Sequence, residues 1–126
     1  MSLPYQYVIL RCVPRVDREE FVNVGVVVYC QQAELLRAGC RIDEDRVRAL
    51  WPEFNIESLK SALAFVDGVC RGDEALGEAA KGDLGTRFGF LKAPRSTVVQ
   101  PGPVHGGITD DPEAELKRLL DLLVGG

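Results

Sequence analysis

A single histidine stands in a loop that is rich in proline and glycine. Pro101, Gly102 and Pro103 lie just before His105, and two further glycines follow it directly. Imidazole is the side chain whose unperturbed pKa lies nearest to neutrality, so His105 could act as a general base or as an anion ligand. Loops also display functional residues more often than regular elements do. The alternative is a turn histidine that holds its own loop in place.

An arginine and a serine follow Pro94, whose ring fixes the local backbone. The guanidinium of Arg95 and the hydroxyl of Ser96 could together bind a phosphate or a carboxylate. The alternative is an ion pair between loops, in which Arg95 contacts Glu19 or Glu20. Ser96 lacks the Gly-x-Ser-x-Gly elbow of a serine nucleophile, which argues against covalent catalysis at this position.

Two polar residues stand within segments of strong strand composition. Arg11 stands in the interior of a run that also holds Tyr5 and Tyr7, and Asn23 stands in the next run. Tyrosine rings can stack on a base or on the guanidinium itself, which favours a ligand pocket. The alternative is a polar sheet face that meets water. The candidate ligand-binding residues are therefore Tyr7, Arg11, Asn23, Arg95, Ser96 and His105.

The four cysteines do not form a recognisable site. They include no Cys-x-x-Cys pair and have no neighbouring histidine, so we expect no bound metal. We interpret Cys12, Cys30, Cys40 and Cys70 as free thiols that lie mostly in the core. No glycine spacing matches a phosphate loop, because the chain lacks Gly-Lys followed by Ser or Thr. The sequence therefore predicts no cofactor.

Length and composition are those of an average globular domain. The chain has 126 residues, of which 46% are hydrophobic and 27% are charged, and this suits a single domain over residues 1–126. A net charge of −4 argues against nucleic-acid binding, which usually needs a basic surface. No apolar run is long enough to span a bilayer, and the first residues do not resemble a signal peptide. We therefore expect a cytoplasmic protein that does not bind membranes.

Three strand-like runs occupy the first third of the chain. Residues 5–13, 21–30 and 35–42 are rich in β-branched and aromatic residues, and short polar segments connect them. Short connections favour an antiparallel meander. Strict alternation places the even-numbered side chains of these runs on one apolar face. It places Arg11 and Asn23 together on the opposite, mixed face.

Two amphipathic helices are predicted to cover the apolar face. Asn55 can cap the first, in which apolar residues recur at steps of three and four as far as Cys70. Asp111 can cap the second, with Pro112 in its first turn. The predicted fold class is α+β, an antiparallel β-meander plus a later strand, with one sheet face covered by both helices. We expect one core to contain Leu10, Val24, Val26, Leu63, Val66, Leu116 and Leu120.

The later strand is predicted from residues 87–91 and 96–100. We expect residues 96–100 to lie beside the first strand of the meander, because that strand has no second neighbour. Arg95 and the loop of His105 would then lie towards opposite ends of this strand. Arg11 can approach both only if the loop folds back, which its glycines permit.

Four segments together resemble a known bacterial family. They are YQYVILR (residues 5–11), EEFVNVGV (19–26), RFGFLKAPRS (87–96) and QPGPVHGG (100–107). The family is catalogued as domain of unknown function 3037, and the likeness spans nearly the whole chain. The family carries no assigned activity, so the resemblance implies no reaction. It does imply a protein partner, a kinase of the HipA type encoded by a neighbouring gene.

The sequence therefore favours a small non-catalytic binding or regulatory module that acts through a protein partner. The alternative is a small enzyme or ligand-binding protein for a phosphate-bearing substrate. Its site would be formed by Arg11, Arg95, Ser96 and His105. Either hypothesis is compatible with a homo-oligomer.

Overall fold

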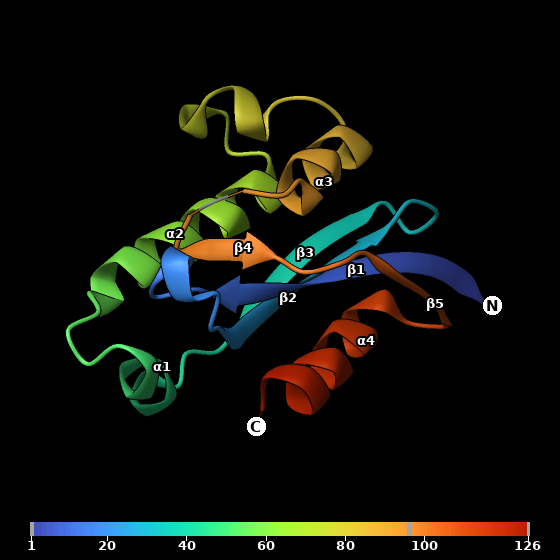
Figure 1. The fold of residues 1–126 in the computed structure, drawn as a ribbon. Helices are drawn as coiled ribbons and strands as arrows, with labels where there is room; N and C mark the ends of the chain where they lie inside the picture. The colour runs from blue at the N-terminus through green and yellow to red at the C-terminus, as the bar shows by residue number, and fades with distance from the viewer. Residues whose placement is uncertain (1, 96, 126) are drawn as a thin grey trace.

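A five-stranded antiparallel sheet forms the centre of the computed structural model, which describes residues 2–95 and 97–125. In chain order the strands are β1 (Leu3–Cys12), β2 (Val22–Cys30), β3 (Leu35–Cys40), β4 (Val99–Pro101) and β5 (His105–Thr109). The first three form a meander in the order β3-β2-β1, and β4 and β5 both pair with β1. The predicted α+β class and antiparallel meander are confirmed (Figure 1).

Two short strands share the outer side of β1. β4 pairs with β1 from Leu10 to Cys12, and β5 pairs with it from Leu3 to Tyr7. The prediction that a strand after Arg95 lies beside the first strand is therefore confirmed. β5 occupies part of a segment predicted to be a loop. The sequence of β5 did not predict a strand, because it contains two glycines and lacks alternating buried residues. Its pairing with β1 makes it a strand.

A β-bulge at Val24 changes which residues of β2 face each side of the sheet. Leu10 pairs with Gly25, whereas Arg11 pairs with Asn23, so Val24 is an extra residue in β2. A bulge interrupts the two-residue alternation of a strand. One core cluster therefore contains Val22, Val24 and Val27, and the other contains Val26, Val28 and Cys30. The single apolar face predicted from strict alternation is wrong for the second half of β2.

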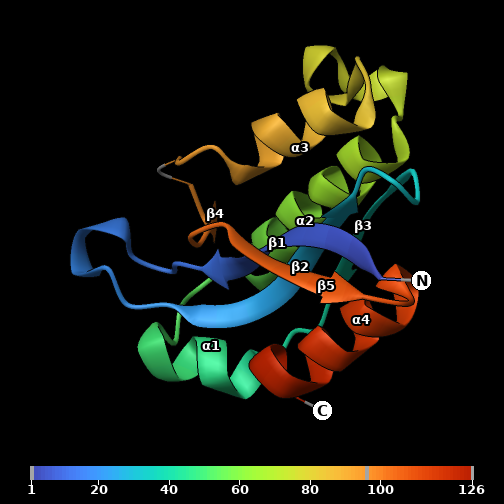
Figure 2. The same cartoon turned by 90° about the vertical axis from the view of Figure 1, so that its right-hand side faces the viewer.

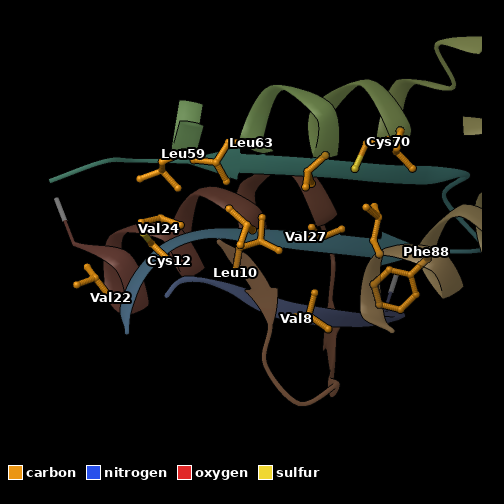
Figure 3. Close-up of a cluster of buried hydrophobic side chains, with 14 of the residues drawn as sticks. Val8, Leu10, Cys12, Val22, Val24, Val27, Leu59, Leu63, Cys70 and Phe88 are labelled. Atoms are coloured by element: carbon orange, nitrogen blue, oxygen red, sulfur yellow. The ribbon is translucent and has the colours of Figure 1, made fainter. Parts of the chain in front are cut away.

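α2 (Ile56–Arg71) covers one face of the sheet. Asn55 caps the helix, since its Oδ1 accepts a hydrogen bond of 3.0 Å from the backbone N–H of Glu57. Apolar residues at steps of three and four give the helix one buried side. The larger core includes Ile56, Leu59, Leu63, Val66 and Val69 of α2 with Val8, Leu10, Cys12, Val24 and Val27 of the sheet (Figure 3).

α3 (Leu84–Lys92) adds to the same core, although a strand was predicted over residues 87–91. Asp83 caps the helix through its side chain. Phe88 and Leu91 are buried three residues apart, and this spacing places them on one side of a helix. The aromatic residues gave the segment a strand-like composition, and its glycines weaken its helix propensity. The burial of these two side chains outweighs that propensity.

α4 (Pro112–Leu119) continues into the π-helical turn η4 (Leu120–Val124) and covers the opposite face of the sheet. The second core consists of Leu116, Leu119, Leu120 and Val124 with Tyr5, Val26, Val28, Cys30 and Leu35. The prediction that both amphipathic helices share one face and one core is therefore wrong (Figures 1 and 2). The reason is the bulge, which turns Val26 and Val28 towards the second face and gives α4 an apolar surface to cover.

Gly39 of β3 lets the C-terminal helix approach the sheet closely. A Cβ atom at Gly39 would overlap the side chain of Leu120. An ion pair of 2.6 Å between Arg41 and Asp121 joins the same strand region to η4. These contacts fix the C-terminal helix over β3 and β2.

Short helical segments complete the fold. They are η1 (Val16–Arg18), α1 (Glu44–Leu50), η2 (Glu74–Leu76) and η3 (Glu78–Ala80). Within the part of the chain that the structure describes, no helix has the length and apolar character needed to cross a membrane. All four cysteines are free, and Cys40 is exposed whereas the other three are buried.

Candidate functional site

α4 and η4 pack on β2 and β3 and leave part of the same sheet face open. The odd-numbered residues Tyr7, Ile9 and Arg11 of β1 are half-buried on this face. Ile9 belongs to neither core cluster. Two exposed side chains border them, Phe21 just before β2 and His105 at the start of β5. We call these five residues the open strip.

Arg11 lies over an aromatic ring at one end of the open strip. Its Cζ is 4.2 Å from the centroid of the Phe21 ring, which is a cation–π contact. Its Nε is buried and has no hydrogen-bond partner among the described residues. The same residues include no carboxylate that forms an ion pair with Arg11. Packing therefore holds this guanidinium without an anionic partner.

A pocket opens beside Arg11. Its lining residues are Arg11, Val13, Val16, Glu19, Phe21 and Gln100. Gln100 is the partner of Arg11 in β4, and Gly102 follows two residues later. A Cβ atom at Gly102 would lie 3.2 Å from Cζ of Arg11, so only glycine leaves the guanidinium this much room. The sheet therefore places one cation beside a partly apolar depression.

Stacked rings occupy the other end of the open strip. Tyr7 is the register partner of His105, and their ring centroids lie 5.1 Å apart with an interplanar angle of 27°. Tyr7 also stacks on Tyr5, at 6.0 Å. The buried hydroxyl of Tyr5 donates a hydrogen bond to Glu115 of α4. Burial and this carboxylate raise the pKa of Tyr5 to about 12, so the phenol remains a donor at neutral pH.

Asn23 joins the open strip to the C-terminal turn. Its Nδ2 donates a hydrogen bond of 3.1 Å to the backbone carbonyl of Leu123. Its Oδ1 is buried and has no partner among the described residues. A buried polar atom without a partner costs about 1–3 kcal/mol of stability. Such atoms are rare in native proteins, and a bound water, ion or ligand usually accounts for them.

The structure brings four of the six candidate residues to one face of the sheet. These are Tyr7, Arg11, Asn23 and His105. Arg95 lies elsewhere, stacked on Phe90 beside a pocket on the α2 side. Arg11, Arg95 and His105 therefore do not face one cavity. Ser96 lies outside the described residues.

The acidic residues near the open strip make other contacts than those predicted. Neither Glu19 nor Glu20 pairs with Arg95, and Glu20 instead pairs with Arg18 at 2.7 Å. Glu19 lines the pocket beside Arg11 with its backbone in the left-handed region, at a φ of 57°. It leaves Arg11 without an ion pair in the described structure.

Sequence reasoning did not select Phe21 as a site residue. The signal was present, because the alternation that places Asn23 on the mixed face also places Phe21 there. A partly exposed phenylalanine just before a strand offers a ring face to a cross-strand arginine. Its relative exposure is 45%, so the ring is available to a binding partner as well.

Comparison with known protein families identifies the chain by its family. The family described as a protein of unknown function (DUF3037) matches residues 7–124. The chain belongs to this family. The matched range of DUF3037 includes the whole open strip and both helices that cover the sheet. No curated protein and no solved structure gives a significant match.

The described residues contain no cluster of three or more histidine, cysteine, aspartate and glutamate side chains arranged to hold a metal ion. What the open strip offers is instead one cation, two phenyl-type rings, one imidazole and one aliphatic side chain on a rigid sheet. This arrangement can bind a complementary surface by stacking, apolar burial and a charge-assisted hydrogen bond.

Proposed function

We propose that this member of the DUF3037 family is a binding module that attaches to a partner protein through the open strip. The observation that carries the proposal is the Arg11–Phe21 pair, in which a guanidinium is held on a ring and lacks an anionic partner among the described residues. Arginine and aromatic residues are enriched in the energetic centres of protein interfaces.

The open strip is organised before any partner arrives. Arg11 is fixed between Phe21 and the backbone at Gly102, and Tyr7 is fixed between Tyr5 and His105. Side chains that are ordered in advance lose less conformational entropy on binding. A fitting partner surface would place a carboxylate or a backbone carbonyl on Arg11 and an apolar side chain on Ile9.

The alternative of a phosphate-bearing substrate has less support from the geometry. That hypothesis needed Arg95 and His105 to converge with Arg11, and Arg95 lies on the other side of the sheet. A single arginine beside an aromatic strip suits a protein surface better than a multiply charged phosphate. The first partner to test is the kinase of the HipA type that the family resemblance implies.

Affinity capture with matched variants tests the proposal. The bait proteins are the unmodified chain, Arg11→Gln, Phe21→Ser and the control Arg48→Gln. Arg48 is not part of the open strip and forms an exposed ion pair with Glu44 on α1, and such pairs contribute little to stability. We expect one protein to be retained in stoichiometric amount by the unmodified chain and by the control, and to be lost from the other two. Equal retention by all four baits would reject the open strip as the binding surface.

A further inference from the structure

A second candidate site lies on the α2 side of the sheet, away from the open strip. A pocket of about 250 Å³ lies where β1, β4, α2 and α3 meet. The buried side chains Leu10, Val66, Leu91 and Val99 contribute to its walls. An apolar cavity of about 150 Å³ can hold benzene, so this volume suits a molecule of about ten non-hydrogen atoms.

One cation borders these apolar walls. Cζ of Arg95 lies 4.5 Å from the centroid of the Phe90 ring, and the Phe90 ring in turn contacts the edge of Phe65. Arg95 is half-buried and forms no ion pair with any described residue. Burial lowers the pKa of its guanidinium, which reflects the loss of water around the charge. A counter-ion at this position would restore the lost solvation.

Arg95 also closes the end of α3. Its Nε donates to the carbonyl of Ala93 at 3.4 Å, and its Nη2 donates to the carbonyl of Phe90. These contacts fix the side chain beside the pocket but involve only two of its three nitrogens. The guanidinium has five N–H donors, so donors remain for a ligand. A role in ending α3 and a role in binding are therefore compatible.

The balance of charge selects the class of ligand. One guanidinium beside apolar walls compensates one negative charge, whereas a phosphate monoester would bring nearly two. A desolvated charge without a counter-charge is costly in apolar surroundings. We propose that this pocket binds a small apolar monocarboxylate, with its carboxylate on Arg95 and its hydrocarbon part against Leu10, Val66 and Leu91. The proposal does not depend on the function of the open strip.

Ligand titrations on the unmodified chain give the first test. The probes are phenylacetate, the neutral isostere phenylacetamide and inorganic phosphate, followed through the methyl NMR signals of Leu10, Val66 and Leu91. We expect saturable shifts with phenylacetate. The amide should bind at least about tenfold more weakly, because it loses the charge-assisted hydrogen bond. Phosphate should give no response, because one of its charges would be left uncompensated. Equal binding of acid and amide, or no saturation by phenylacetate, would overturn the proposal. Tighter binding of phosphate would overturn it as well.

Two variants and one control locate the site. Arg95→Gln removes the charge, and Ala62→Leu fills the pocket from α2 with a residue that favours helix. Each should weaken phenylacetate binding by about tenfold or more. Arg48→Gln should leave it unchanged. Unaltered affinity in both Arg95→Gln and Ala62→Leu, with circular dichroism showing that they are folded, would contradict the assignment.

Discussion

Arg11 and Asn23 lie opposite each other in β1 and β2, and each has one buried polar atom without a hydrogen-bond partner among the described residues. One atom is a donor, Nε of Arg11, and the other is an acceptor, Oδ1 of Asn23. The two groups are chemically complementary but do not form a hydrogen bond with each other. Each residue also makes one stabilising contact, Arg11 with the Phe21 ring and Asn23 with the carbonyl of Leu123. The unpaired atoms offset part of that stabilisation, because a buried donor or acceptor without a partner is costly.

The first prediction concerns the stability cost of Arg11. Arg11→Met keeps an unbranched apolar stem against Phe21 and removes the buried Nε. We expect the free energy of unfolding in urea to stay the same or to rise by up to about 1 kcal/mol, since a desolvated donor is lost and the packing remains. A loss of more than about 1 kcal/mol would show that Arg11 holds the fold together.

Arg41→Met is the matched control for that experiment. Arg41 pairs with Asp121 and donates a hydrogen bond of 2.7 Å to the carbonyl of Gly125. Its replacement should lower stability, because both contacts fix the C-terminal turn. Both arginines occupy odd-numbered positions of the predicted strands, and their structural partners distinguish them.

The second prediction separates the two cores. Val26 and Leu120 belong to one cluster, and Leu63 belongs to the other across the sheet. Leu63→Ala and Leu120→Ala should each cost about 2–5 kcal/mol. In double-mutant cycles, Val26→Ala should couple to Leu120→Ala by about 0.5 kcal/mol or more and should add to Leu63→Ala without coupling. Coupling of Val26 to Leu63 with none to Leu120 would mean that the faces are assigned incorrectly.

Sequence patterns predicted the helices and strands of this fold better than the sheet face on which each helix packs. The meander, the helix capped by Asn55 and the helix capped by Asp111 follow from local signals, because alternation and capping act over a few residues. The bulge at Val24 has only a weak signal in Gly25, because a glycine within a strand marks either a bulge or a close approach of another segment. One extra residue exchanges the faces to which the side chains in the second half of β2 point. The C-terminal helix therefore packs on the face opposite to the predicted one.

The candidate site was predictable only in part for a related reason. Arg11, Asn23 and Tyr7 share a face because strand alternation holds for β1 and for the part of β2 before the bulge. His105 joined them through pairing of β5, which no pattern in its glycine-rich sequence specifies. The position of Arg95 depends on α3 being a helix, and the buried contacts of Phe88 and Leu91 decide that.

The third prediction concerns the thiols. Burial raises the pKa of Cys12 to about 11 and that of Cys70 to about 12, so almost no thiolate is present at neutral pH. Cys40 is exposed as a residue, although its sulfur points towards Gly25 and its pKa is also raised, to about 11. We expect slow labelling of the native protein with Cys40 first, and four reactive thiols after unfolding. Fast reaction at Cys12, or fewer than four thiols without reductant, would contradict this.

The last prediction is that the free energy of unfolding depends on pH through the phenol of Tyr5. Burial, followed by the hydrogen bond to Glu115, raises the pKa of Tyr5 from 10.0 to about 12 in the folded protein. Between these pH values the unfolded chain has lost a proton that the folded chain still holds. Stability from this group is therefore complete below pH 10 and is lost as the pH rises towards 12. Tyr5→Phe lacks the titrating group, so the difference in free energy of unfolding between the two proteins should shrink over this range. A constant difference from pH 10 to pH 12 would show that the Tyr5–Glu115 contact does not control the phenol.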